Sequence, residues 1–274
     1  MTVHPSLQNY ADAWAHSIEA IFELVKPLVD SDWNRRTPCP SWSVRDVVSH
    51  VIGMESEMLG DPRPIHSLPR DLYHIQSESA RYMELQVDVR RHHTALENVS
   101  ELEYTIIRRN RQLRNESRSP DTMVPAPLRK QQTLENAMRA RAFDVWVHEQ
   151  DLRYALNRPG NIDSPGSLIV RDALLAALPK VIAKDAGAPP NSAIVIDVTG
   201  PLEFLRTVRV NADGRGTIDG SPSLGPVVTL ATDWETYYRL ACGRVRPAAV
   251  AHLVKLDGDE ELGAAILREF AVTP

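Results

Sequence analysis

The chain has 274 residues, of which 43% are hydrophobic and 24% charged, an ordinary globular composition that is long enough for two domains. Its formal net charge of −5 gives no general reason to expect a nucleic-acid or membrane partner, and no apolar run approaches the roughly 20 residues that span a bilayer. The start, MTVHPSLQNYADAW, does not have the pattern of a secretory signal, and two cysteines make no disulfide framework, so we expect a cytoplasmic protein.

A long amphipathic helix is predicted at the start of the chain. Apolar residues recur there every seven positions, with a second set at the same spacing between them: Leu7, Trp14, Ile21 and Leu28, then Ala11, Ile18 and Val25. Such a stripe packs on other helices. The two prolines of SDWNRRTPCPSW end this pattern.

A second helix is predicted after that break. Ser43 and Asp46 have the spacing of a capping box, and an apolar pattern from Val47 to Met58 follows them. The segment DPRPIHSLP, residues 61–69, ends the pattern because it contains three prolines.

Two further helical regions complete the predicted bundle. One runs from the seventies to about Asn115, with or without a break, and its predicted buried side consists of Leu96, Val99, Leu102, Ile106 and Leu113. A proline-containing loop follows, and the last helix runs from about Thr133 to Leu156. These regions predict a four-helix bundle with at least one long connection.

Two Pro-Gly pairs within residues 157–166 mark a domain linker, so we expect a helical domain over 1–160 and a second domain over 167–274. The second domain mixes predicted strands and helices. Strands are expected at 193–198, 204–210, 214–219 and 227–231, and helices at 167–184, 234–241 and 260–270. The turn segment NADGRG predicts an antiparallel hairpin, and the grouping of strands favours an α+β domain.

A possible metal site lies in RAFDVWVHEQDLRYAL, residues 141–156. Asp144 and His148 are four residues apart, so on a helix they share one face and can chelate one divalent ion. Asp151 shares that face, and His50 on the second predicted helix is the candidate third ligand. Two histidines and one carboxylate leave a coordination position open, which is typical of catalytic zinc sites and also suits Fe(II).

Ordinary structural roles compete with this hypothesis. A helical Asp-x-x-x-His pair is most often a surface pair, and a single histidine on an apolar helix is usually a hydrogen-bonded core residue. Asp151 either orients His148 or faces water. A basic cluster of four arginines is typical of a solvated face, and attraction of an anionic substrate is its alternative role: Arg108, Arg109, Arg111 and Arg114.

Three segments resemble the mycothiol-dependent maleylpyruvate isomerase family, which belongs to the DinB-like metalloenzyme superfamily. They are TPCPSWSVRDVVSHVIGMESEM (37–58), RAFDVWVHEQDLRYAL (141–156) and WETYYRLACGRVRP (234–247), in the family's order. The resemblance implies a DinB-like four-helix bundle followed by a small α+β domain similar to sterol carrier proteins.

The same resemblance implies a zinc site formed by His50, Asp144 and His148. Asp144 departs from the family pattern, which has glutamate there, and aspartate is one methylene shorter. The family also uses an arginine of the C-terminal domain near the active site, and Arg244 is the favoured candidate over Arg239 and Arg246.

The activity implied by the resemblance begins with mycothiol as a low-molecular-weight thiol cosubstrate bound to zinc. Its thiolate attacks an electrophilic small molecule, which gives either cis–trans isomerisation or S-transfer. A non-catalytic metal-binding or ligand-binding member of the same fold is the alternative, and the Asp144 departure favours it. We expect a monomer or homodimer without nucleic-acid or membrane partners.

Overall fold

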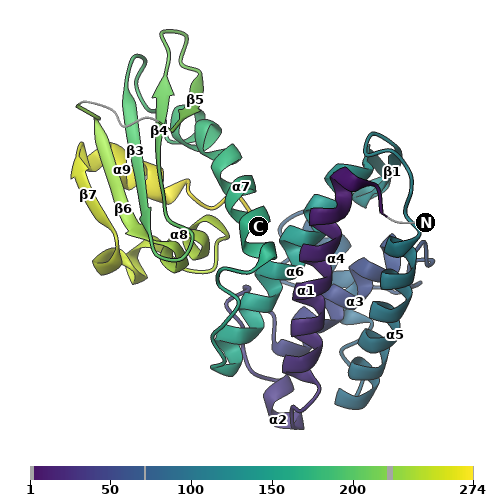
Figure 1. Ribbon diagram of the computed structural model, residues 1–274. Helices are drawn as coiled ribbons and strands as arrows, with labels where there is room; N and C mark the ends of the chain where they lie inside the picture. The colour runs from purple at the N-terminus through teal and green to yellow at the C-terminus, as the bar shows by residue number, and fades with distance from the viewer. Residues whose placement is uncertain (1–2, 71, 221–224, 274) are drawn as a thin grey trace. The chain divides into compact units, whose positions relative to one another are not determined.

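The structure is a computed structural model that describes residues 3–70, 72–220 and 225–273 (Figure 1). Its internal contacts divide the chain into two compact units, Met1–Ile169 and Val170–Pro274. Within the described residues, every helix is too short or too polar to cross a membrane.

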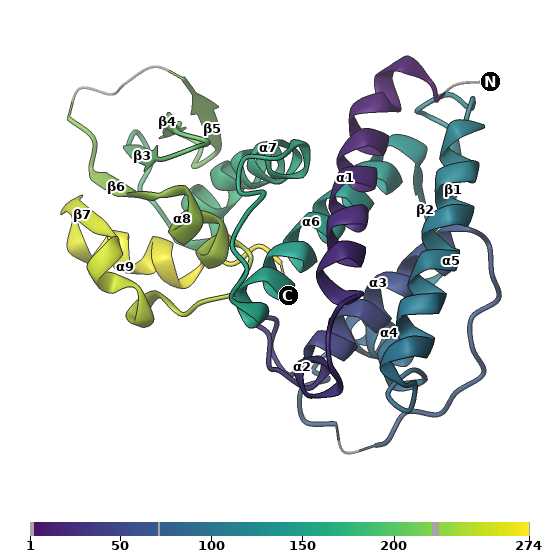
Figure 2. The same cartoon turned by 60° about the horizontal axis from the view of Figure 1, so that its bottom comes forward.

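The first unit is a helical bundle, as predicted. Its long helices are α1 (Gln8–Val25), α3 (Val44–Met58), α5 (Ala95–Arg114) and α6 (Leu134–Leu156). Helix α1 packs against α5 and α6, and α3 packs against the same two helices (Figures 1 and 2). The four segments therefore enclose one core between them.

The apolar stripe of the first helix is the reason that it is buried. Trp14, Ile18 and Ile21 are almost completely covered, in agreement with the predicted heptad spacing. The helix ends at Val25, so Leu28 lies beyond it. A 3-10 turn, Pro5–Leu7, precedes α1, and a short helix, α2 (Asp30–Trp33), follows it.

Helix α3 begins at the predicted capping box. The Ser43 side chain accepts a hydrogen bond from the backbone N–H of Asp46, and the Asp46 carboxylate accepts one from the backbone N–H of Ser43. This reciprocal cap satisfies two of the free N–H groups at the helix start. The cap fixes the residue at which α3 begins, and therefore the position of each of its side chains along the helix axis.

The third predicted region consists of two helices, α4 (Glu78–Asp88) and α5. Helix α4 packs closely on α3 because Gly53 lies at their contact: a Cβ atom there would come 2.4 Å from Cβ of Gln86. The prediction that Leu96 is buried is wrong, because its side chain is 74% exposed. Leu102, Ile106 and Leu113 are buried as predicted, and Asn98 and Arg109 share their face.

A small hairpin replaces the loop predicted around residues 120–127. Strand β1 (Met123–Ala126) pairs antiparallel with β2 (Lys130–Thr133), and the 3-10 turn Pro127–Arg129 joins them. Pro125 lies within β1, and a two-stranded ribbon tolerates proline because its outer edge makes no ladder. Thr133 then caps α6.

The second unit contains a mixed sheet, five-stranded within the described residues, in the order β5-β4-β3-β6-β7. Strands β3 and β6 are parallel, and the other neighbours are antiparallel, including the predicted β4–β5 hairpin. The strands are β3 (Ala193–Thr199), β4 (Phe204–Val210), β5 (Gly216–Asp219), β6 (Val228–Asp233) and β7 (Lys255–Gly258).

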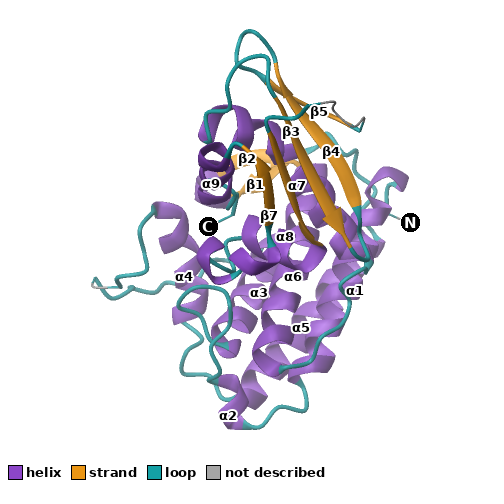
Figure 3. Ribbon diagram, turned by 90° about the vertical axis from the view of Figure 1, so that its left-hand side faces the viewer, coloured by secondary structure: helices purple, strands orange, loops and turns teal. Residues whose placement is uncertain are grey.

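Helices accompany this sheet and confirm the α+β class (Figure 3). They are α7 (Pro165–Lys180), which continues as a π-helical turn Val181–Asp185, α8 (Trp234–Ala241) and α9 (Glu260–Arg268). Helix α8 packs on β3 and β6, and α9 packs on β6 and β7. Trp234, Tyr237 and Phe270 form an aromatic cluster in the core of this unit.

Candidate metal centre

The three metal ligands predicted from the sequence lie together inside the helical unit. His50 comes from the middle of α3, and Asp144 and His148 come from successive turns of α6. One possible ligand atom of each residue lies within 4.8 Å of the other two. The imidazole rings of His50 and His148 are 4.8 Å apart, centroid to centroid.

Both histidines turn Nε2 toward the same carboxylate. Oδ2 of Asp144 lies 3.3 Å from Nε2 of His50, and Oδ1 lies 3.6 Å from Nε2 of His148. The two histidine side chains are almost fully buried, whereas the Asp144 side chain is 30% exposed. The cluster is therefore closed on the imidazole side and open to solvent on the carboxylate side.

Asp151 fixes the orientation of His148. Its Oδ2 atom lies 3.1 Å from Nδ1 of His148, and both residues are buried. A carboxylate only accepts hydrogen bonds, so Nδ1 must donate, and Nε2 then presents its lone pair to the cluster. Of the two roles considered from the sequence, Asp151 has the orienting one.

Packing and the contact of Nε2 with Asp144 hold His50. Its Nδ1 atom is buried and has no hydrogen-bond partner in the described part of the chain. The ring of Trp42 lies 4.9 Å from that of His50 and 5.9 Å from that of His148. Trp42 closes a turn whose backbone returns to Thr37, and this turn presents the indole to both imidazoles.

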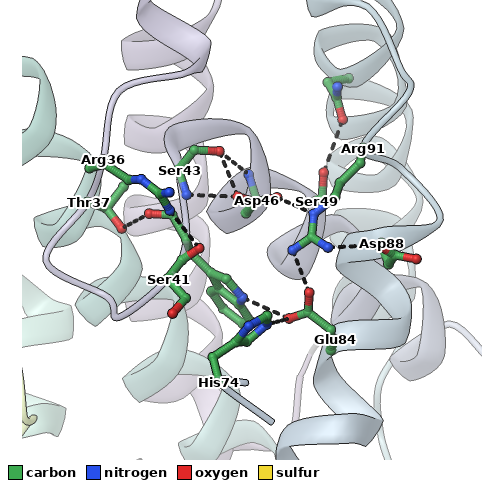
Figure 4. A network of polar contacts seen from close by, with 12 residues as sticks. Arg36, Thr37, Ser41, Ser43, Asp46, Ser49, His74, Glu84, Asp88 and Arg91 are labelled. Carbon is green, nitrogen blue, oxygen red and sulfur yellow. Dashed lines mark hydrogen bonds and ion pairs between the residues drawn. The ribbon is translucent and has the colours of Figure 1, made fainter. Parts of the chain in front are cut away.

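A polar network from α4 anchors Trp42. The indole Nε1–H donates to Glu84, at 3.0 Å from Oε2. Glu84 also contacts His74 and Arg91, and Arg91 contacts Asp46 and Asp88 (Figure 4). The network connects the cap of α3, the indole of Trp42 and α4 beside the candidate metal ligands.

A second buried network, which the sequence analysis missed, includes Asp144. Nη1 of Arg141 is 2.9 Å from Oδ2 of Asp144, and Nε of Arg141 is 2.8 Å from Oε1 of Glu55. The other oxygen of Glu55 lies 2.9 Å from Nε of Arg109. Arg109 was assigned to a solvated face, and this was wrong because both arginines and Glu55 are buried.

The carboxylate of Asp144 is ionised, and the histidines respond to it differently. Burial opposes the charge of Asp144, but Arg141 and the two imidazoles outweigh burial and hold its pKa well below the usual value. Burial lowers the pKa of His50 despite Asp144. Burial also acts against a charged His148, but Asp144 and Asp151 outweigh it and raise the pKa of His148. A metal ion bound here would therefore compete with a proton chiefly at His148.

The donor set fits the metal that the sequence resemblance implies. Two imidazole nitrogens and one carboxylate oxygen suit a zinc ion with an open coordination position, and they also suit Fe(II). The shorter side chain of Asp144 still brings both carboxylate oxygens beside the imidazoles. Loss of one methylene, relative to glutamate, thus leaves the donor atoms within reach of one ion.

A second group of potential ligands overlaps the first. Atoms of Cys39, His148 and Asp151 also lie within 4.8 Å of one another, but all three residues are buried. This group shares His148 with the first and lacks its exposed side. An exchangeable ligand would therefore enter more easily at Asp144.

Arg244, the candidate catalytic arginine, lies in the second unit after α8. Its backbone N–H bonds the carbonyl of Arg239, and its guanidinium lies 2.7 Å from the carbonyl oxygen of Cys242. The three candidate ligands come together within the first unit, and Arg244 belongs to the second.

The orienting role of Asp151 leads to a testable prediction. Asp151→Asn should weaken zinc binding by about 10–100-fold, because the amide no longer enforces donation from Nδ1 of His148. Chelator competition would measure the affinity. Asp163, outside this cluster, offers an Asp→Asn control that should leave it unchanged. Equal affinity in Asp151→Asn and wild type would contradict the orienting role.

Comparisons with known proteins identify relatives of both the sequence and the fold. The family profile described as "Mycothiol maleylpyruvate isomerase N-terminal domain" matches residues 14–153, just over half of the chain. The crystal structure of the mycothiol-dependent maleylpyruvate isomerase has a TM-score of 0.59 at 12% identity, over 94% of this chain and 96% of that chain. The crystal structure of a mutant of that enzyme gives 0.58 at the same identity and coverage.

A sterol carrier protein domain is also similar to part of the chain. The solution structure of domain 2 from Helicoverpa armigera covers 41% of this chain and 93% of its own, with a TM-score of 0.31 and 17% identity. A search of curated proteins finds no match. At these identities, the resemblance to the isomerase crystal structures establishes the fold.

Proposed function

This chain belongs to the mycothiol maleylpyruvate isomerase family, and on that premise we propose that it is a metal-dependent enzyme using a low-molecular-weight thiol, mycothiol, as its nucleophile. The single observation that supports this most is the convergence of His50, Asp144 and His148 into one cluster with an exposed side. The second substrate is an electrophilic small molecule that the thiolate attacks.

His50, Asp144 and His148 would hold the metal, which we propose to be zinc. When bound, zinc lowers the pKa of a coordinated thiol and so supplies thiolate at neutral pH. Asp151 keeps the proton of His148 on Nδ1, so that Nε2 is available as a ligand. The ring of Trp42 packs against both imidazoles, and we propose that it restricts the approach of water to them.

Cis–trans isomerisation is the reaction that family membership favours. The thiolate sulfur forms a bond to one carbon of the substrate's double bond, and the electron pair of that double bond moves into the adjacent carbonyl. Rotation about the new single bond and expulsion of the thiolate then restore the double bond in the trans form. If the adduct instead takes up a proton and leaves, the result is S-transfer.

A non-catalytic binding protein is the second candidate. The observation that favours it is Asp144, which replaces the glutamate of the family pattern. The proximity of its oxygens to both Nε2 atoms supports a working metal site instead. Turnover is what distinguishes the two candidates.

The test is to incubate zinc-loaded protein with mycothiol and maleylpyruvate and to follow the trans product and any thiol adduct by chromatography and mass spectrometry. We expect product only when both metal and thiol are present. Arg244→Ala should lower the rate and leave the zinc content unchanged, because we propose that Arg244 binds a substrate rather than the metal. Zinc binding without any thiol-dependent product would favour the binding protein.

A further inference from the structure

The carboxylate of Asp144 is shared between the candidate metal centre and a guanidinium. Oδ2 lies 2.9 Å from Nη1 of Arg141, while Oδ1 faces Nε2 of His148. An oxygen engaged by a guanidinium gives up part of its negative charge to that charge-assisted hydrogen bond. Oδ1 is therefore the oxygen of Asp144 that an ion could bind without competition from Arg141. The carboxylate also presents less than a full negative charge to that ion.

Arg141 has little freedom to leave this position. Its Nε donates to Glu55, which is completely buried, and Arg109 holds the other oxygen of Glu55. Nη2 of Arg141 is itself buried without a hydrogen-bond partner among the described residues. The positive charge of Arg141 is thus fixed beside the metal ligands by a carboxylate that is itself held in place.

Formal charges show what this arrangement does to a bound ion. The formal charges that contact the candidate ligands are the carboxylates of Asp144 and Asp151 and the guanidinium of Arg141, and they leave one net negative charge. Glu55 and Arg109 pair with each other beyond Arg141, so their charges cancel. A divalent ion in the cluster turns that into one net positive charge, which a single anion cancels. Without Arg141, the loaded cluster would be neutral and would gain nothing from an anion.

We propose that Arg141 is a positioning residue that makes this metal centre select an anionic ligand over a neutral one. The proposal rests on the proposed function, in which that anion is the thiolate of the cosubstrate. Arg141 acts through Asp144: it occupies Oδ2 and offsets the charge that this carboxylate would otherwise give the ion. The effect favours thiolate over water or a neutral donor at the open position.

Cobalt(II) in place of zinc allows a direct test, because its visible spectrum changes when an external ligand binds. Thiocyanate serves as the anionic probe and imidazole as the neutral probe, and the ratio of their affinities is the readout. In Arg141→Met and Arg141→Gln, the ratio should fall by about tenfold or more, because a fixed charge close to the ion is lost. Affinity for cobalt should stay the same or rise.

Two further variants separate this role from a structural one. Arg109→Met removes the other buried arginine of Glu55, which does not contact Asp144, and should leave the ratio unchanged. Arg141→Lys keeps the charge and should keep most of the preference for thiocyanate. The two neutral replacements leave Glu55 paired with Arg109, so no buried carboxylate loses both partners.

An unchanged ratio in both neutral variants would overturn the proposal, and so would an equal shift in Arg109→Met. Failure of the proposed function would give a different experimental result. The wild-type protein would then fail to take up cobalt, or would take it up and bind neither probe. A wild-type protein that binds both probes while the neutral variants keep its ratio contradicts only the role of Arg141.

Discussion

Replacing His148 with alanine should weaken zinc binding by more than about a hundredfold, because the loss of a direct ligand exceeds the 10–100-fold effect of losing an outer hydrogen bond. His148 contacts two carboxylates of the site. Its Nε2 faces Asp144, and its Nδ1 is held by Asp151. After the substitution, only His50 and Asp144 of the three candidate ligands remain as donors, and Asp151 loses its contact with His148.

Elemental analysis of purified wild-type and variant proteins would measure this loss. His16→Ala is a matched control, because His16 is exposed on α1 and lies outside the cluster. Circular dichroism should show the same helical content in both variants. Stoichiometric zinc in His148→Ala would show that His148 is not a ligand and that another residue supplies the third donor.

The second large effect is expected on stability. Glu55→Ala should lower the free energy of unfolding of the helical unit by about 3–5 kcal/mol, since it leaves the buried charges of Arg109 and Arg141 without their shared carboxylate. Arg141 retains Asp144, but Arg109 loses its carboxylate partner and keeps the contacts with Gln112 and with the ring of Trp14, neither of which carries a negative charge. An uncompensated buried charge is among the most destabilising consequences of a single substitution.

Denaturant unfolding followed by tryptophan fluorescence would measure this change, because Trp14, Trp33, Trp42 and Trp146 all lie in the first unit. Glu103→Ala, at an exposed position of α5, should change the free energy by no more than about 0.5 kcal/mol. A Glu55→Ala variant as stable as Glu103→Ala would show that the buried network does not contribute to the free energy of unfolding.

The pH dependence of stability gives Glu55 a second readout. Burial acts to raise its pKa, but Arg141 and Arg109 outweigh burial and lower it from the ordinary value of 4.5. The stabilisation is therefore present above pH 4.5 and is lost as the pH falls through the lowered pKa of the folded state. Glu55→Ala should lack this part of the acid dependence.

The main elements of the fold could be predicted because their patterns are local. Trp14, Ile18 and Ile21 repeat at helical spacing, and Ser43 and Asp46 begin α3 as their spacing predicts. The four-residue strand β7 was missed because it has only one partly covered side chain and no alternating pattern. Its place is set by pairing with β6, a contact that no local pattern reveals.

Polar residues at buried positions explain the remaining errors. On α5, Leu102, Ile106 and Leu113 are buried as predicted, but Asn98 and Arg109 share the covered face, and Leu96 lies outside it. Arg141 continues the buried series of α6, and Glu55 continues that of α3. A charge at an apolar position requires a buried partner, and this signal could have indicated the network.

The candidate ligands themselves were predictable for a different reason. Asp144 and His148 are one helical turn apart, so their proximity follows from helix geometry alone. His50 was named as the candidate third ligand from its place on the second predicted helix, and the resemblance implied the same role. Its proximity to residues almost a hundred positions later depends on helix packing, which no local pattern reveals. The network around Trp42 and Glu84 depends on the packing of α4, which the sequence pattern placed only roughly.

Calorimetric titration of mycothiol into the protein tests the central claim most directly. We expect binding to the zinc-loaded protein, with release of a proton that appears as a difference between buffers of different ionisation enthalpy, because the bound form is thiolate. Metal-free protein should bind far more weakly, and so should a simple alkyl thiol, which lacks the hydroxyl and amide groups of mycothiol. Equal binding of mycothiol to loaded and metal-free protein, without proton release, would contradict thiol activation at the cluster of His50, Asp144 and His148.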